Sequence, residues 1–335
     1  MCLMQSKPGE IPILDNLRAV AAWSVCLYHF ICTTTGLINP GGLLYKSFYF
    51  GQFGVHLFFI ISGMVIPWSL YKNDYRIKSL FSFLLKRLIR LEPPYLFSIL
   101  LIIAVLYLRK YSPSYDGVDR LVTTQQVFLH LGYLVPFFEN ITWLNNVYWT
   151  LAIEFQYYLA IGVLYFLFVS PSIYIRVMGY LVLLAAPFIP VSADFLPYWL
   201  PLFGVGIILF LYKAERINAV ELRIVCLSFL IHLWFFNSPV TSVIAAAATL
   251  IIMYLFCYSN KWLSFLGKFS YSVYLIHPIL GSTFVNVFSH YVSGGWAKLL
   301  LVLGGVVITL AGSYLMYLFI EKPSKKLSSK LRYKS

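Results

Sequence analysis

The residues of this sequence with the clearest chemical use are Arg18 and His29, eleven positions apart in the apolar run LRAVAAWSVCLYHF. In a helix, eleven residues return to within roughly 20° of the start and rise about 16 Å. The pair therefore shares one helix face. A neutral imidazole with a reference pKa of about 6.5 can take a proton from a hydroxyl nucleophile. The run predicts a general base at His29, with a guanidinium below it.

Arg87 and Arg90, in KRLIRLEPPY, also share a helix face because they lie three residues apart. Paired guanidinium groups suit a phosphate clamp for a cytosolic donor. Anchoring at the inner membrane surface explains both arginines, and Arg18, equally directly. The proline pair at 93–94 predicts a break in the helix.

Glu154 is a carboxylate inside the apolar run WTLAIEFQYY, with Thr150 and Tyr158 one turn either side on its face. An unpaired buried carboxylate is strongly penalised, so Glu154 is expected to have a partner. The candidates are the nearby basic side chains of the other runs: Arg18, His29, Arg87 and Arg90. A purely structural ion pair is the alternative.

Tyr274 and His277 are neighbours on one helix face in SYSVYLIHPIL. Pro278 cannot donate to the carbonyl of Tyr274, which leaves a polar acceptor inside the helix bundle. A simple proline kink is the alternative. In GVHLFFIISGM, Gly63 favours close helix packing, and His56 is either a core histidine or a functional one.

These polar residues lie in a membrane protein, because hydrophobic residues make up 60% of the chain, charged residues 11%, and mean hydropathy is +0.80. Soluble domains carry about 25% charged residues. About ten runs are long enough to span a bilayer, and they are continuously apolar, unlike the strands of a membrane β-barrel. The fold class is therefore an all-α polytopic bundle. The predicted spans are 13–35, 47–70, 92–108, 146–168, 177–191, 195–212, 223–237, 240–258, 270–289 and 299–320.

The positive residues behind the net charge of +13 are divided unequally between the two sides of the membrane. With a cytoplasmic N-terminus, 20 of the 25 Lys and Arg residues fall on the inner side. This positive-inside bias places both termini in the cytoplasm and removes the need for a nucleic-acid partner. The first span lacks the cleavage site of a removable signal peptide. The five Cys residues have no metal-ligand spacing.

We expect one integral-membrane domain over 1–335, ending in a basic, mobile cytoplasmic tail from about 321. The basic segment 72–94 predicts an amphipathic helix along the inner interface before the third span. The outer connection 109–145 contains an apolar stretch at 127–138 that is too short to span the bilayer. We expect it to be re-entrant or interfacial and packed against the bundle.

The order of these motifs along the chain resembles the acyltransferase-3 family. The shared features are Arg18 with His29, GVHLFFIISG, Arg87 and Arg90 with Pro93 and Tyr95, Trp149-Thr150-Leu151 with Glu154, SYSVYLIHP, and Glu321-Lys322-Pro323. Each motif is short, but six in order over nearly the whole chain form a specific pattern. The sequence departs from the family at three positions. His56 stands where Asp is common, Thr150 where Ser is usual, and Glu92 lies beside the arginine pair.

The resemblance implies a multi-pass enzyme of the inner or plasma membrane that acylates, commonly O-acetylates, a sugar of a surface polysaccharide, O-antigen or glycolipid. It implies a cytoplasmic acyl-CoA, such as acetyl-CoA, as co-substrate, with no bound cofactor or metal. The implied catalytic residues are His29, Glu154 and Arg18. The implied donor- or substrate-binding residues are Arg87, Arg90, Tyr95, Trp149, Tyr158, Tyr274 and His277.

In the corresponding hypothesis His29 is the base for an acceptor hydroxyl, or carries the acyl group, and Glu154 orients it. Cys26 is a less favoured nucleophile, because a buried Cys usually behaves as a small apolar residue. Two rivals remain. A transporter or flippase for an anionic or glycan substrate would also use buried charges. A membrane scaffold would use them only to pack helices.

Overall fold

The apolar runs form helices, and several of these begin at a residue whose side chain caps the first turn. Asn218, Ser238 and Asn260 each accept hydrogen bonds from backbone N–H groups in the first turn of the helix that follows.

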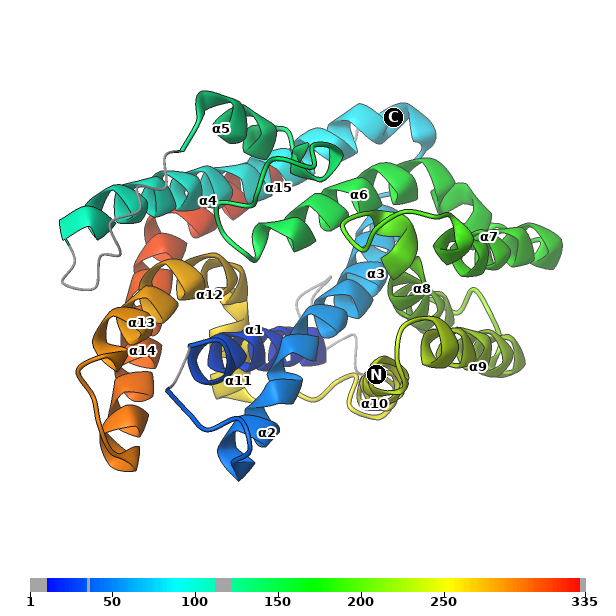
Figure 1. The fold of residues 1–335 in the computed structure, drawn as a ribbon. Helices are drawn as coiled ribbons and strands as arrows, with labels where there is room; N and C mark the ends of the chain where they lie inside the picture. Colours follow the sequence, from blue (N-terminus) through cyan, green and yellow to red (C-terminus); the bar gives the residue numbers. More distant parts are fainter. Residues whose placement is uncertain (1–10, 35–36, 112–121, 332–335) are drawn as a thin grey trace.

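The computed structural model describes residues 11–34, 37–111 and 122–331, and these form helices and connecting loops without strands (Figure 1). The first half contains α1 (Pro12–Cys32), α2 (Leu43–Tyr49), α3 (Gly54–Lys72), α4 (Leu80–Leu108), α5 (Thr124–Leu131), α6 (Tyr148–Val169) and α7 (Ile173–Ala185). The second contains α8 (Leu196–Lys213), α9 (Ala219–Phe236), α10 (Pro239–Tyr254), α11 (Lys261–Lys268), α12 (Ser270–Ile276), the π-helix η7 (His277–Ser282), α13 (Thr283–Ser289), α14 (Gly295–Met316), the π-helix η8 (Tyr317–Glu321) and α15 (Lys322–Ser329).

Seven helical segments among the described residues are long and apolar enough to cross a bilayer. They contain α3, α4, α6, α8, α9, α12 with α13, and α14. Of the other predicted spans, α7 and α10 are apolar but shorter, and α1 carries Asp15 and Arg18. Each of the ten predicted ranges overlaps a helix. The all-helical, multi-pass architecture is therefore confirmed, and the count of ten crossings stays a prediction.

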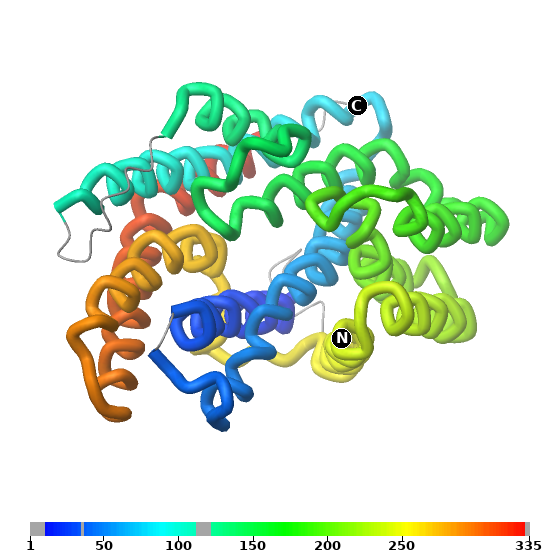
Figure 2. The backbone as a smooth tube through the Cα atoms, in the orientation of Figure 1, coloured from blue at the N-terminus to red at the C-terminus, as the bar shows by residue number. Residues whose placement is uncertain are grey.

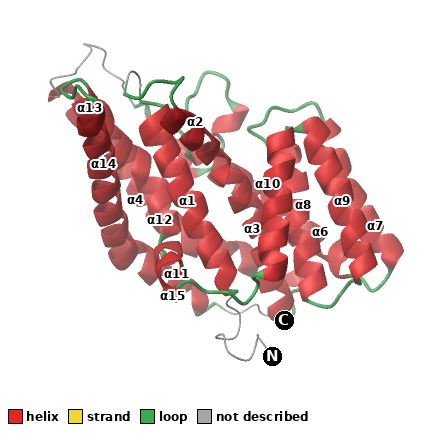
Figure 3. Ribbon diagram, turned by 90° about the horizontal axis from the view of Figure 1, so that it is seen from below, coloured by secondary structure: helices red, strands yellow, loops and turns green. Residues whose placement is uncertain are grey.

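The helices are arranged around α1 and α3, which occupy the middle of the bundle. The α12–α14 helices lie on one side, and α6 to α10 lie on the other (Figures 1 and 3). Close contact between α3 and α8 depends on Gly63, because a Cβ there would lie 2.2 Å from the carbonyl oxygen of Phe203. The predicted packing role of Gly63 is confirmed.

Helix α4 runs without interruption through Pro93 and Pro94. The predicted helix break, and the separate interfacial helix before it, are therefore wrong for residues 80–94. Proline removes backbone donors, but surrounding side chains in a bundle can compensate the affected backbone. The Tyr271 hydroxyl donates to the Leu91 carbonyl over 3.0 Å beside the prolines.

The connection between α4 and α6, which the sequence predicts on the outer side, folds back against α4. The Tyr95 hydroxyl of α4 donates to the His130 carbonyl over 3.0 Å, and the Tyr133 hydroxyl donates to the Glu92 carboxylate over 2.7 Å. The His130 ring bonds within the segment through the carbonyl of Gln126 and the N–H of Leu144. This agrees with the expected packing of 127–138 against the bundle; the stretch 112–121 lies outside the described residues.

The C-terminal helix α15 lies along the first turns of α4 (Figure 2). The Ser328 hydroxyl donates to the Lys86 carbonyl over 2.9 Å, and the Lys86 ammonium donates to the Leu331 carbonyl over 3.2 Å. The expectation of a mobile tail from 321 is therefore wrong up to 331, because a small-residue face of α15 docks on α4. Residues 332–335 lie outside the described residues. Helix α15 lies at the same end of the bundle as the N-terminal end of α1 (Figure 3).

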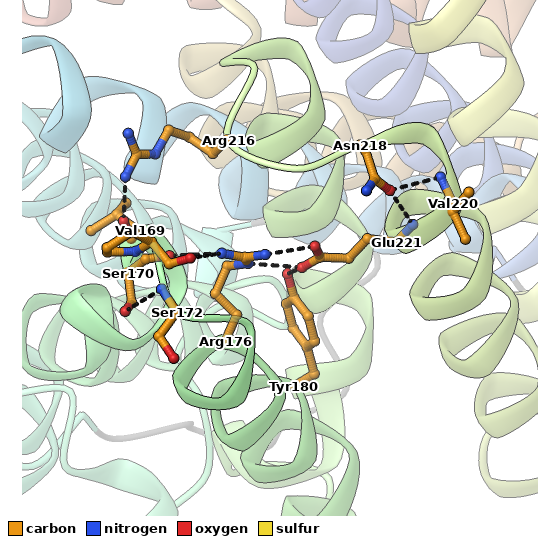
Figure 4. Close-up of polar contacts among 10 residues, drawn as sticks. Val169, Ser170, Ser172, Arg176, Tyr180, Arg216, Asn218, Val220 and Glu221 are labelled. Carbon is orange, nitrogen blue, oxygen red and sulfur yellow. Dashed lines mark hydrogen bonds and ion pairs between the residues drawn. The ribbon is translucent and has the colours of Figure 1, made fainter.

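A buried ion pair ties α7 to α9 (Figure 4). The Arg176 guanidinium contacts both carboxylate oxygens of Glu221, over 2.8 and 2.7 Å. The Tyr180 hydroxyl donates to the same carboxylate over 2.8 Å. Nη1 of Arg176 donates to the carbonyls of Ser170 and Pro171. Because every charge here has its partner, this cluster is structural.

Candidate active site

The two histidines predicted on separate runs form a direct pair. Nδ1 of His29, in the last turn of α1, lies 2.9 Å from Nε2 of His277, the first residue of η7. The rings stack with centroids 5.1 Å apart. His277 is completely buried, whereas His29 is partly exposed. The pair therefore has one anchored imidazole and one that a substrate can approach.

The π-helix sets the position of His277. Pro278 leaves the Tyr274 carbonyl without its usual backbone donor, as the sequence predicted. Such π-segments occur often at functional sites. Nδ1 of His277 lies 3.1 Å from the Val273 carbonyl. Gly281 lets α1 approach, because a Cβ there would lie 2.2 Å from the Phe30 ring.

Thr150 and Tyr274 join two of the predicted motifs beside this pair. Their hydroxyls lie 2.9 Å apart, and the Tyr274 ring stands 5.9 Å from that of His277. Trp149, the neighbour of Thr150, instead packs against Trp199, with ring centroids 5.5 Å apart. Within this family motif, Thr150 therefore contacts the histidine site through Tyr274, and Trp149 belongs to the aromatic core.

His56 lies in that aromatic core. Its ring stands 5.0 Å from Phe53 and 5.4 Å from Trp199. Among the described residues its Nδ1 has no hydrogen-bond partner. These contacts give His56 a packing environment away from the hydrogen bonds of the histidine pair.

Glu154 has its own set of partners. Its Oε1 accepts from the Ser62 hydroxyl over 3.0 Å and from the Tyr158 hydroxyl over 2.5 Å. Glu154 also lines a cavity of about 10 Å³ with Arg87 and Glu92, which has room for about one water molecule. Of the predicted partners, an arginine of the 87/90 pair is near Glu154. The other two candidates, His29 and Arg18, have different partners, His277 and Asp15.

A second polar cluster lies at the other end of α1. Arg18 forms an ion pair with Asp15 over 3.0 Å. Lys325 of α15 forms an ion pair with the buried Glu321 over 2.6 Å, and Arg18 and Arg90 lie close enough to repel its ammonium group. Three cations from three helices therefore converge here.

The two arginines that the sequence placed on one face both lie near Lys86 and Tyr158, and each has further neighbours of its own. Arg90 belongs to the cluster with Arg18 and Lys325, while Arg87 is buried over the rings of Phe83 and Tyr158. Sequence reasoning missed Lys325, although its i, i+4 spacing from Glu321 was a readable signal.

Tyr95 and Cys26 are embedded in the bundle. Tyr95 is completely buried, and its hydroxyl donates a hydrogen bond to the His130 carbonyl. Cys26 is completely buried in an apolar cluster with Phe30 and Val285. These environments favour packing for both and give Cys26 no activating base.

Comparison with known proteins identifies the family of this chain. A family model described as an acyltransferase domain matches residues 11–318, nearly the whole chain. The chain belongs to the acyltransferase-3 family. No curated protein and no solved structure matches it. Membership identifies the protein as a multi-pass membrane acyltransferase.

Proposed function

We propose that this acyltransferase moves an acyl group, most simply acetyl, from a cytoplasmic acyl-CoA to a sugar hydroxyl. The acceptor is a surface polysaccharide, an O-antigen or a glycolipid, lipid-linked or at the cell surface. The enzyme works in the inner or plasma membrane. The donor is a co-substrate, and no resident cofactor is required.

The observation that carries this proposal is the placement of two polar clusters along α1. Arg18 lies with Arg90 and Lys325 at one end, and His29 lies eleven residues further on, about 16 Å along the axis. Coenzyme A has its phosphates at one end of a long flexible arm and its thioester at the other. Guanidinium groups suit the phosphates, and an imidazole suits the reacting end.

The proposed reaction is direct transfer. Nε2 of His29 takes the proton of the sugar hydroxyl as its oxygen bonds to the thioester carbonyl carbon. The carbon–sulfur bond then breaks, and the leaving thiolate takes the proton from His29. The products are the sugar ester and free coenzyme A, and His29 returns to its starting state.

Glu154 supports this reaction from a distance. It lines a small cavity with Arg87 of α4, and it receives hydrogen bonds from Ser62 of α3 and Tyr158 of α6. We assign Glu154 and Arg87 to positioning these helices. Arg18 is assigned to donor binding, because its side chain faces the cationic cluster.

The test compares glycans and glycolipids by mass spectrometry from cells that carry the wild-type protein, the His29→Ala variant or no protein. We expect one class of sugar to lose the mass of one acyl group in both deficient cells. Identical acyl content in all three would overturn the proposal. Unchanged acylation with altered glycan export would favour the transporter alternative instead.

A further inference from the structure

The hydrogen bonds of His277 determine which of its ring nitrogens carries a hydrogen. Nδ1 lies 3.1 Å from the Val273 carbonyl, and a carbonyl oxygen only accepts hydrogen bonds. Nδ1 of His277 is therefore the protonated nitrogen. In a neutral imidazole the other nitrogen, Nε2, is then an acceptor.

The neutral form follows from the surroundings of the two rings. His277 is completely buried, and among the described residues no carboxylate contacts His277 or His29. An imidazolium without a counter-charge inside an apolar bundle is strongly penalised. His277 is therefore neutral at rest.

The state of His29 follows from that of His277. Its Nδ1 lies 2.9 Å from Nε2 of His277, which is an acceptor, so Nδ1 of His29 must donate. The unprotonated nitrogen of His29 is then Nε2. This is the reverse of the tautomer that a free histidine side chain prefers in water.

We infer that His277 is a positioning residue that holds His29 as its Nδ1–H tautomer and leaves Nε2 of His29 free to accept a proton. Two backbone features support this arrangement. The Val273 carbonyl orients His277, and His277 is the first residue of the π-helix η7, which contains Pro278 and packs against α1. When His29 takes a proton, its Nδ1–H bond to His277 becomes charge-assisted and therefore stronger. The catalytic part of this inference rests on the proposed function, and the tautomer does not.

The direct test is solid-state ¹⁵N NMR of histidine-labelled protein in lipid bilayers, without any acyl donor. The signals of the two rings are assigned by their loss in His29→Asn and His277→Gln. We expect wild-type His29 to be protonated at Nδ1 and coupled through a hydrogen bond to Nε2 of His277. In His277→Leu, which removes the acceptor, His29 should revert to Nε2–H. A wild-type His29 protonated at Nε2, or an unchanged tautomer in His277→Leu, would overturn the inference.

Kinetics with acetyl-CoA provide the second readout. His277→Leu should lower kcat by about 100-fold or more, the size of a general-base contribution, with KM for acetyl-CoA within about twofold. His277→Gln carries an amide oxygen that can accept from His29 Nδ1–H, and it should keep kcat within about tenfold of wild type. Equal losses in the Leu and Gln variants would contradict the positioning role. If no acyl transfer is found but the NMR tautomer is as expected, the proposed function fails and the assignment of His29 stands.

Discussion

His29 and His277 are 248 residues apart in sequence, yet their facing ring nitrogens lie 2.9 Å apart. In many hydrolases a carboxylate occupies the place that His277 has here, orienting the base and stabilising its charge. A neutral imidazole orients the base without bringing a second charge into the apolar bundle, where an unpaired ion is costly. In the part of the chain that the structure describes, Glu154 contacts Ser62 and Tyr158 and makes no hydrogen bond to the base.

His29→Ala should abolish acyl transfer, with a loss of at least about 100-fold, because it removes the proposed general base. The side chain is partly exposed, and its removal leaves the His277–Val273 contact in place, so the amount of protein in the membrane should be unchanged. Acyl content of surface glycans and an immunoblot of membranes measure the two effects. His232→Phe is the matched control and should retain transfer, because the His232 ring stacks on Phe236 within α9, away from the histidine pair. Normal acylation in His29→Ala would exclude His29 as the base.

Arg90→Ala should raise KM for acetyl-CoA by about 10- to 100-fold, because a hydrogen bond to a charged group contributes about 1.5–3 kcal/mol. The effect on kcat should be smaller, because Arg90, in α4, lies in the cluster of Arg18, and Arg18 is about 16 Å from His29 along α1. Steady-state kinetics of purified protein in lipid give both constants. Arg223→Ala removes a guanidinium that contacts the Ala219 carbonyl at an exposed site, and it should leave KM unchanged. An unchanged KM in Arg90→Ala would place the donor phosphates elsewhere.

Glu154→Gln should lower transfer about tenfold or more, because it removes the charge that faces Arg87 across their shared cavity. Tyr158→Phe deletes one hydrogen bond to Glu154 but keeps the charge, so it should lower thermal stability while retaining most transfer. The measurements are thermal unfolding in detergent and transfer per folded protein. If the two variants lose transfer to the same extent, the charge of Glu154 has no separate role.

Contacts within one helix could be predicted from the sequence, and contacts between helices could not. The i, i+4 spacing of Glu154 and Tyr158 predicted a shared face, and their side chains bond over 2.5 Å. The pairing of His29 with His277 depends on the relative rotation and height of α1 and η7, which a single sequence does not encode. The spacing of Arg18 and His29 along α1 could be predicted, but their separate partners, Asp15 and His277, could be assigned only from the structure.

Tertiary packing also overrides local signals in α4 and α15. Pro93 and Pro94 predict a helix end, but α4 continues because Tyr271 and the neighbouring helices stabilise it. The basic composition after residue 321 predicts a mobile tail, but the small face of α15 fits α4 through Ser328. Hydropathy predicted the helices themselves, because their apolar runs depend only on local sequence.

Arg176→Ala should lower the stability of the protein by about 3–5 kcal/mol, because it leaves the buried Glu221 carboxylate without its partner. Transfer per folded molecule should not change, since this cluster lies apart from both polar clusters of the site. Thermal unfolding and a transfer assay on the surviving protein measure the two. Arg216→Ala is the matched control in the same region (Figure 4), because its guanidinium donates to the Val169 carbonyl at an exposed site. A Tm equal to that of wild type in Arg176→Ala would contradict the structural role.

Acid should loosen the outer segment that contains α5, and His130 is the group responsible. Burial lowers the pKa of His130 below its ordinary value of 6.5, although the contact with the Gln126 carbonyl partly opposes this. Its Nε2 accepts from the Leu144 N–H over 3.0 Å, and protonation there would replace this acceptor with a donor. His130 therefore binds a proton more readily when this segment is locally unfolded than when it is folded. The contribution of neutral His130 to the stability of the folded segment is complete above about pH 6.5. It is lost as the pH falls from there toward the lower pKa of His130 in the folded state.

Hydrogen–deuterium exchange of residues 124–145, corrected for the intrinsic effect of pH, should therefore show falling protection below about pH 6.5. In His130→Gln the titrating group is absent, so protection of this segment should be lower at neutral pH and nearly constant with pH. The α6 peptides, which contain no histidine, report on any general acid effect within the same sample. Protection that falls equally in wild type and His130→Gln would assign the acid response to another group.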